Sequence, residues 1–134
     1  MRYSLFFGNG AARPAQLTRL GAAFNHPFIH TPATLHIGDA PARLGYATVA
    51  TDNVVLTALK TAEDGDGIIV RLSELNGEDT EASVVFDPAF AAGLSTAACV
   101  DLMERPRAGG AAGFSGNTLR ASVPAYGFVT VRVR

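Results

Sequence analysis

The alternation of apolar and polar side chains in the second half of the chain limits its fold more than any other feature. Ile68, Val70 and Leu72 alternate with Arg71 and Ser73. Because successive side chains of a β-strand point to opposite faces, this pattern places one face against a core and the other toward solvent. Gly, Asn, Asp and Pro residues separate such segments, which is typical of an antiparallel sandwich. We therefore predict a mostly β fold, an antiparallel β-sandwich.

Five strands are predicted in this half of the chain, at residues 54–60, 67–74, 80–86, 119–123 and 129–133. The first is a nearly continuous apolar run, which favours a central strand, and a tight acidic turn joins it to the second. Asn76-Gly77 comes next, the pair that best tolerates the two positive φ angles of a type I′ turn, so a hairpin is predicted there. The first three strands are thus expected to form a meander.

The length and composition suit one packed domain. Of the 134 residues, 48% are hydrophobic and 17% are charged, which is typical of a globule with a single core. We therefore predict a single β-sandwich domain over residues 1–134. Residues 51–134 form its sandwich core, and residues 1–50 form a less regular N-terminal part.

The N-terminal part shows both extended and helical patterns. Residues 3–7 are a strand candidate. Residues 14–24 are predicted to form a short helix, because Pro14 suits the first helical position and apolar residues share one face. Weaker strand patterns lie near Leu35 and Ala47.

Two segments between the predicted strands are less regular. Residues 98–104 fit a strand or a helix, and we favour the strand. Residues 108–116 are rich in Gly and Ala and are predicted to form a loop. Cys99 lies in an apolar run, which favours a buried, inert thiol.

The charge pattern argues against several classes of partner. The 11 basic and 12 acidic residues give a net charge of -1 without the basic stripe that nucleic-acid binding requires, so no nucleic-acid partner is expected. No apolar run approaches the roughly 20 residues that span a bilayer, and no signal-peptide pattern is found. We therefore expect no membrane partner and a cytoplasmic location, which a single cysteine also fits.

Acidic residues gather in one turn. A retaining glycosidase needs two carboxylates about 5 Å apart, one of them with a raised pKa. Glu63, Asp64 and Asp66 instead lie in a glycine-rich turn, where short carboxylates bond to the turn backbone and face water. The turn also lacks the third oxygen donor of a calcium loop. The favoured interpretation is structural.

The histidine and aromatic residues do not predict a zinc site or a sugar-binding site. His26, His30 and His36 are close in sequence, but prolines break the helix that would bring them together as zinc ligands. We therefore predict no catalytic, cofactor-binding or metal-ligating residue. The chain has no Trp, so its N-terminal rings favour core packing or contact with a neighbouring domain over sugar binding; these rings are Phe6, Phe7, Phe24 and Phe28.

Residues 54–74, VVLTALKTAEDGDGIIVRLSE, resemble a stretch near the C-terminus of glycoside hydrolase family 38 α-mannosidases. Phe24-Asn25-His26-Pro27 and residues 126–132 resemble two further segments of that family, in the same order. The resemblance implies an enzyme of several domains. In it, an α/β barrel holds a zinc ion, the nucleophilic aspartate and the acid, and a helical bundle and β-domains follow.

What the resemblance implies for this chain is the final β portion of such an enzyme. None of the family's zinc ligands or catalytic carboxylates has a matching position here, so the chain is expected to be no enzyme by itself and to carry no cofactor. Zinc is expected in the absent catalytic domain of a retaining α-mannosidase. The expected partners are the catalytic and helical domains, with mannose-type carbohydrate as a further candidate.

The resemblance also suggests where to look for a functional contribution. In this family, terminal β-domains pack against the barrel and help to shape the substrate cleft. Glu63, Asp64, Asp66 and Arg71 are therefore candidates for a substrate-cleft or interdomain loop. The alternative function is that of an independent carbohydrate-binding module, which needs a polar sandwich face with exposed rings.

Overall fold

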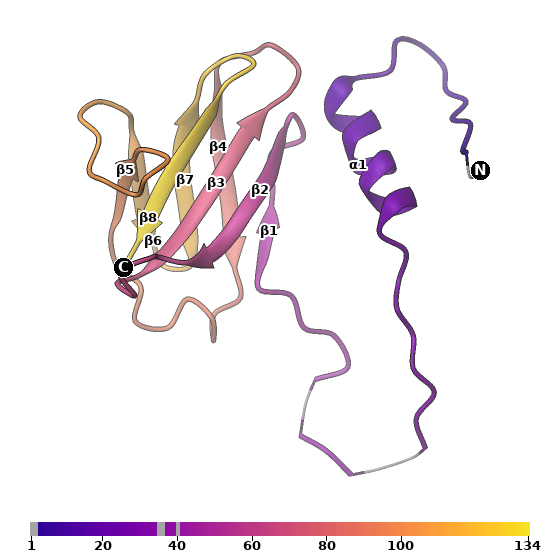
Figure 1. Ribbon diagram of the computed structural model, residues 1–134, viewed down its shortest axis with the longest axis horizontal. Helices are drawn as coiled ribbons and strands as arrows, with labels where there is room; N and C mark the ends of the chain where they lie inside the picture. The colour runs from indigo at the N-terminus through magenta and orange to yellow at the C-terminus, as the bar shows by residue number, and fades with distance from the viewer. Residues whose placement is uncertain (1–2, 35–36, 40) are drawn as a thin grey trace.

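The computed structural model describes residues 3–34, 37–39 and 41–134 and, within them, has one helix and eight strands (Figure 1). In chain order these are α1 (Pro14–Asn25), β1 (Ala47–Val49), β2 (Val54–Thr61), β3 (Ile68–Glu74), β4 (Thr80–Phe86), β5 (Ala97–Val100), β6 (Ala112–Ser115), β7 (Thr118–Val123) and β8 (Phe128–Val133). The strands form two antiparallel sheets, so the predicted β-sandwich with a short N-terminal helix is confirmed.

Each sheet has four strands. The first has the order β1-β4-β7-β6 and the second the order β2-β3-β8-β5. The core lies between them, where Leu72, Val84, Leu119 and Val131 are fully buried. Burying a side chain of this size stabilises the fold by roughly 1.5–3 kcal/mol. The alternation in the sequence therefore reports correctly which residues face the core.

The predicted hairpin at Asn76-Gly77 is wrong. β3 pairs with β2 and β8, whereas β4 pairs with β1 and β7, so the connection crosses from one sheet to the other. A type I′ turn needs positive φ at both central residues, but among described non-glycine residues only Glu104 and Tyr126 have positive φ. The φ angle of Asn76 is not positive, because the connection wraps around the Glu74 carboxylate, to which the N–H groups of residues 76–78 donate.

The predicted central position of the first strand is also wrong, and with it the three-stranded meander. β2 lies at the edge of its sheet and pairs with β3 alone. β2 is nearly continuously apolar for another reason, namely that both of its faces are partly covered. Val54 is buried in the core, and Val55 lines a hollow beside α1. The β2–β3 hairpin itself, with its acidic turn, is confirmed.

The N-terminal part lies beside the sandwich, as Figure 1 shows. The predicted helix is confirmed as α1, with Pro14 in its first turn, and so is the strand near Ala47. The Leu35 candidate falls on residues 35–36, outside the described residues. The strand predicted at residues 3–7 is wrong, since this described segment pairs with no strand in the described part of the chain.

Few contacts hold α1 against the sandwich. The Ala15 N–H donates a hydrogen bond to Asn76 Oδ1 at 3.3 Å. The Arg19 guanidinium donates to the carbonyl oxygens of Thr51 and Val54 at 3.3 and 3.1 Å. No helix in the described ranges has the length and apolar character needed to cross a membrane.

The two less regular segments differ in part from prediction. Residues 98–104 begin as strand β5, but the strand ends at Val100 and a tight turn follows. The predicted loop at residues 108–116 is wrong, because it contains β6, which pairs with β7. β6 is short and lies at a sheet edge, where a glycine such as Gly113 is tolerated.

Candidate functional site

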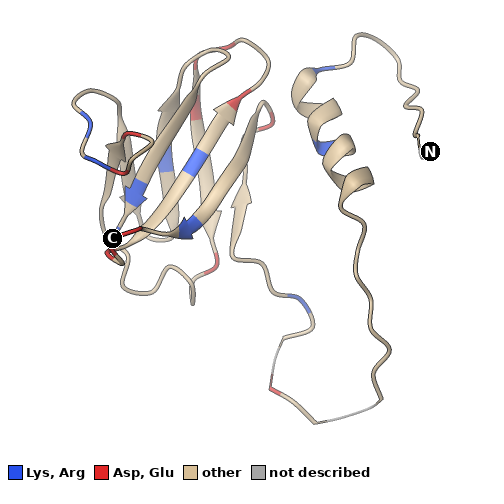
Figure 2. Cartoon of the chain, viewed as in Figure 1, with Lys and Arg blue, Asp and Glu red and all other residues tan. Residues whose placement is uncertain are grey.

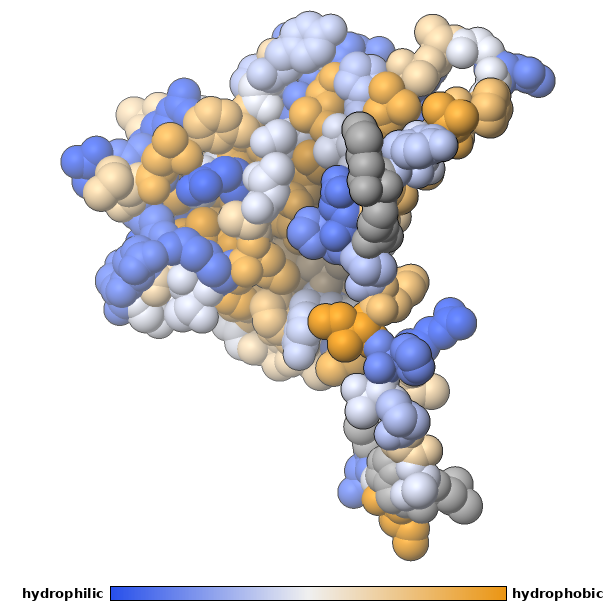
Figure 3. Space-filling view, turned by 45° about the vertical axis from the view of Figure 1, so that its right-hand side comes forward, coloured by the Kyte–Doolittle hydropathy of each residue, from blue (hydrophilic) through white to orange (hydrophobic). Residues whose placement is uncertain are grey.

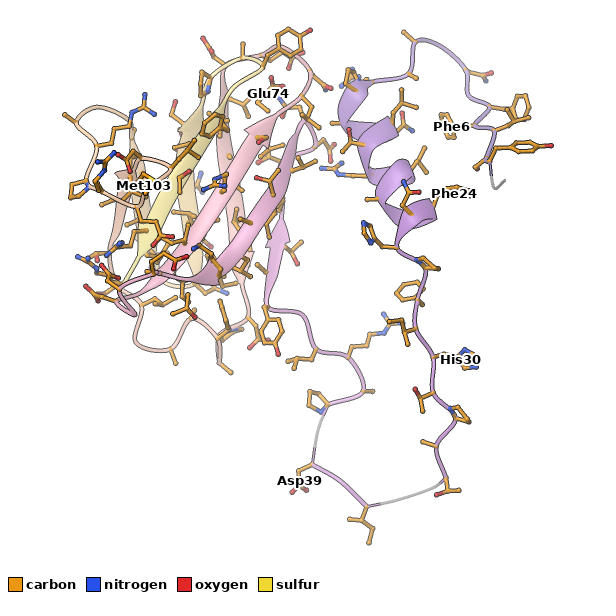
Figure 4. All side chains as sticks on the ribbon, viewed as in Figure 1. Phe6, Phe24, His30, Asp39, Glu74 and Met103 are labelled. Carbon is orange, nitrogen blue, oxygen red and sulfur yellow. The ribbon has the colours of Figure 1, made fainter. Side chains whose placement is uncertain are left out.

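A depression of about 420 Å³ lies on the outer face of the second sheet. We call it the charged depression. The turn after β5 covers part of this face, and Figure 4 labels Met103 in that turn. Figure 2 shows basic and acidic residues meeting near the C-terminal end of β8. The depression is lined by Glu63, Asp64, Ala98, Cys99, Val100, Met103, Glu104, Arg105, Pro106, Arg132 and Arg134.

The β2–β3 turn forms one wall of the charged depression. Its backbone is closed by hydrogen bonds from the Ala62 N–H to the Gly67 carbonyl, 3.0 Å, and from the Asp66 N–H to Asp64 Oδ1, 3.0 Å. Gly67 has a φ of 96°, and a Cβ there would lie 2.5 Å from the Val133 carbonyl oxygen. Only glycine therefore lets this turn lie against the end of β8.

Arg132 lines the charged depression and is only 8% exposed. Its place on β8, opposite Ile69 of β3 and Ala98 of β5, directs it to the outer face. Its Nη1 donates to Asp64 Oδ2 at 2.6 Å, and its Nη2 donates to the Glu104 carbonyl oxygen at 3.1 Å. The bond to Asp64 raises the pKa of Arg132 and lowers that of the Asp64 carboxyl. The pair is thus a fixed ion pair.

Glu104 reaches the same place from the turn after β5. Its backbone has a φ of 62°, and its buried carboxylate accepts a bond from the Glu63 N–H at 2.7 Å and pairs with Lys60 Nζ at 2.7 Å. Lys60 also pairs with the Glu63 carboxylate. The Lys60 ammonium lowers the pKa of Glu104. Glu104 therefore fastens the β2–β3 turn to the β5–β6 connection.

Two other predicted site residues, Asp66 and Arg71, do not line the depression. Asp66 pairs with Arg134 at 2.9 Å, and both side chains are largely open to solvent. Arg71 is not among the lining residues; its Nε donates to Thr130 Oγ1 at 3.1 Å. Of the predicted residues, Glu63 and Asp64 therefore line the depression, Asp66 reaches it only through Arg134, and Arg71 lies outside it.

Four charged residues at this site were not predicted from the sequence: Lys60, Glu104, Arg132 and Arg134. The last two carried a signal, because they alternate with the apolar residues of β8 and so had to face outward. The pairing of β8 with β3, which brings them to the acidic turn, joins residues more than 50 positions apart and has no local signal.

The arrangement neutralises charge rather than preparing a carboxyl group for catalysis. A general acid needs a raised pKa, whereas the pKa of Asp64 and that of Glu104 are both lowered. No group of three or more His, Cys, Asp or Glu in the described ranges is placed to hold a metal ion. His36 lies outside the described residues. Cys99 is buried, as predicted, and burial raises the pKa of its thiol.

The comparison with known families agrees with this geometry. The family model described as the glycosyl hydrolases family 38 C-terminal β-sandwich domain matches residues 53–126, more than half of the chain. No curated protein and no solved structure matches the chain significantly. The matched residues include the acidic turn and most of both sheets, and a domain of this kind is not catalytic in itself. The chain belongs to the family 38 glycosyl hydrolase C-terminal β-sandwich domains.

Proposed function

We propose that this chain is the non-catalytic C-terminal β-sandwich of an α-mannosidase and that it supports or completes the catalytic domain of that enzyme. In this proposal the parent enzyme is zinc-dependent and retaining, and its zinc ion and catalytic carboxylates lie in other domains. The partners of the chain are then the catalytic and helical domains.

One observation carries the proposal, namely the exposure of large apolar side chains in the connection between α1 and β1. Phe28, Ile29 and Ile37 are fully exposed there, and Leu44 is largely exposed. We call these four the N-terminal apolar residues. Figure 3 shows the N-terminal part projecting from the body of the molecule. Covering large apolar side chains is favourable, and we infer that a neighbouring domain covers these.

The charged depression also supports a contact between this chain and a catalytic domain. Glu104, Arg132 and Lys60 hold the acidic turn rigid, while Glu63 and Asp66 remain open to solvent. A rigid, charged turn suits contact with the rim of a catalytic domain, because little conformational entropy is lost when such a surface is covered. The proposed interdomain loop therefore consists of Glu63, Asp64 and Asp66, without Arg71.

The test uses a zinc-loaded family 38 α-mannosidase from which the C-terminal β-sandwich has been deleted. Adding the purified chain is expected to raise its melting temperature and its turnover of nitrophenyl α-mannoside. A variant with Phe28→Ser, Ile29→Ser and Ile37→Ser is expected to have no such effect. A matched variant, Val85→Ser with Leu102→Ser, changes exposed apolar residues elsewhere and should act like the unmodified chain. If the unmodified chain changes neither quantity, the proposal is wrong.

A second candidate function is the binding of mannose-type carbohydrate in the charged depression. Its walls carry carboxylate and guanidinium groups beside the apolar Met103 and Pro106, and small-molecule sites combine such polar groups with apolar lining. NMR titration of the chain with mannose and mannobiose tests this function. Saturable shifts of the Asp64 and Glu104 amides, lost in Asp64→Asn, are expected if sugar binds, and unchanged spectra exclude it.

A further inference from the structure

The edge of β2 is an unpaired strand edge. Glu74, opposite Val54, directs its N–H away from β2 to the Gly127 carbonyl, 2.9 Å. Val54 therefore points its own backbone groups outward, and its carbonyl accepts the Arg19 bond. The Val54 N–H donates to the Thr51 carbonyl at 3.3 Å, so both backbone groups of Val54 already have partners. Past Val54 and the bulge at Leu56/Ala58, the residues whose backbone groups face outward are Leu56, Leu59 and Thr61. In the described part of the chain, no strand pairs with this edge.

Two hollows follow this edge. One of about 480 Å³ lies between α1 and the first half of β2, and another of about 290 Å³ lies where Tyr46 and Phe90 meet the second half. β1, on the same side of the sandwich, has only three residues against the eight of β2. The core is consequently open here, and Val49, Leu56 and Leu59 are only partly buried. A long, partly apolar edge of this kind is a template for an added strand.

The N-terminal segment of residues 3–7 has the properties of such a strand. Tyr3, Leu5 and Phe7 would share one face of a strand and are 78%, 71% and 84% exposed, and Phe6, on the other face, is 48% exposed. Aromatic and large apolar residues favour pleated, half-buried surfaces. Five residues span about 17 Å as a strand, and the eight of β2 span about 26 Å, so the segment fits within the edge. Among the described residues, neither the segment nor the edge from Leu56 to Thr61 pairs with another strand.

A second copy of the chain is the occupant that the geometry favours. The segment runs on the side of α1 away from the sandwich, as Figures 1 and 4 show, with Phe6 labelled there. To reach its own β2, it would have to pass around a helix roughly 10 Å wide. The β2 edge of a second molecule can approach the segment directly. Each copy then binds the N-terminal segment of the other.

We propose that residues 3–7 of one copy add as a strand to the β2 edge of a second copy, which forms a two-fold symmetric dimer. Main-chain hydrogen bonds to the outward groups of β2 supply the affinity, and the side chains of Tyr3, Leu5 and Phe7 cover the open core. The proposal goes beyond the proposed function, because it requires this chain alone and none of the N-terminal apolar residues.

Sedimentation equilibrium of the full chain, from micromolar to millimolar concentrations, is the first test. The unmodified chain is expected to be dimeric, and Leu5→Asp with Phe7→Asp is expected to weaken the dimer by at least about 100-fold. Phe28→Asp with Ile29→Asp makes the same chemical change at another exposed site and should leave the dimer intact. A chain that is monomeric throughout, or a dimer that both variants weaken equally, would overturn the proposal.

Hydrogen exchange gives a second readout that does not depend on mass. The amides of Leu56 and Leu59 point outward from β2 and are expected to be protected in the dimer. They should exchange rapidly in the Leu5→Asp/Phe7→Asp variant, while Val70, which lies in the core, stays protected in both. Rapid exchange at Leu56 and Leu59 in the unmodified dimer would place the contact elsewhere. Since no parent enzyme is present, this result is independent of the proposed function.

Discussion

The Glu74 carboxylate lies 2.9 Å from the backbone N–H of Tyr126, although 52 residues separate the two. The same carboxylate accepts bonds from the N–H groups of Asn76, Gly77 and Glu78 at 2.7, 2.8 and 3.2 Å. One buried carboxylate thus joins the β3–β4 connection to the β7–β8 connection, at the end of the sandwich where Figure 4 labels Glu74. Charge-assisted bonds of this kind are stronger than neutral ones.

Replacing Glu74 should destabilise the domain in a pH-dependent way. Burial opposes ionisation of this carboxyl, but the N–H groups of Tyr126, Asn76 and Gly77 outweigh it and lower its pKa from 4.5 to about 2. The carboxylate therefore stabilises the fold fully above pH 4.5, and this contribution is lost as the pH falls toward 2. Glu74→Gln is expected to lower the melting temperature by about 10 °C at pH 7, with a difference that shrinks below pH 4.

The exposed Glu81 of β4 provides the control for that experiment. Glu81→Gln removes the same charge at a site open to solvent and should leave the melting temperature nearly unchanged. Thermal unfolding by circular dichroism between pH 2 and pH 7 makes the comparison. If the melting temperatures of Glu74→Gln and the unmodified chain differ by the same amount at every pH, the stabilising role of the ionised Glu74 carboxylate is contradicted.

Removing the ring of Phe86 should cost about 3–5 kcal/mol of unfolding free energy. This side chain is 1% exposed and lies 5.8 and 6.0 Å, between ring centroids, from Phe90 and Phe114. Phe86→Ala leaves a cavity that the two sheets can close only in part. Phe28→Ala is the matched control, since that ring is fully exposed. Urea unfolding should show a large loss for the first and almost none for the second.

Arg132→Met should destabilise the charged depression at neutral pH. The change leaves the carboxylates of Asp64 and Glu104 without the guanidinium that both face, and the second of these is buried. We expect a melting temperature about 5 °C lower at pH 7. Arg120→Met, on the exposed side of β7, should change it little.

The pH dependence of this variant follows from the carboxyl groups. The pKa of Asp64 is lowered by Arg132, and that of Glu104 by Lys60. The ion pairs therefore stabilise the fold above the ordinary carboxyl range, and this contribution is lost as the pH falls through the lowered pKa values. The gap between Arg132→Met and the unmodified chain should narrow in acid. A gap that widens in acid would show that the pairs do not act as described.

Asp66→Asn separates a functional role of the acidic turn from a structural one. The Asp66–Arg134 pair is exposed on both sides, and exposed pairs contribute little to stability. The substitution should leave the melting temperature of the chain nearly fixed. In the complemented α-mannosidase, it should change turnover of nitrophenyl α-mannoside if the turn contacts the catalytic domain, and unchanged kinetics would remove the turn from the proposal.

The face of each strand could be predicted because burial is a local property of the pattern. Leu119, Ala121 and Val123 alternate with Arg120 and Ser122, and the first three are buried while the other two are exposed. Any sandwich with this strand next to a core gives the same result. The burial of Cys99 was predicted from another local property, the apolar run around it, and is confirmed.

The choice of strand partners could not be predicted in this way. Asn76-Gly77 is a strong local hairpin signal, but the buried Glu74 carboxylate draws the N–H groups of the following residues toward itself. That carboxylate is stabilised by Asn53 and Tyr126, which are distant in sequence. A long-range interaction therefore overrides the turn preference.

The candidate site shows the same limit. Period two predicts that Arg132 faces outward, but its ion pair with Asp64 needs the register between β8 and β3. Glu104 reaches Arg132 through a turn with a positive φ at a non-glycine residue, a conformation that side chains disfavour. Only the folded neighbours make that conformation stable.

Calorimetric titration of the purified chain into the zinc-loaded family 38 α-mannosidase that lacks its C-terminal β-sandwich measures directly whether this β-sandwich binds the rest of such an enzyme. We expect a saturable one-to-one complex of micromolar affinity or tighter, lost when Phe28, Ile29 and Ile37 are changed to Ser. The absence of binding at millimolar concentration would contradict the proposed function, and so would hydrolysis of nitrophenyl α-mannoside by the chain alone.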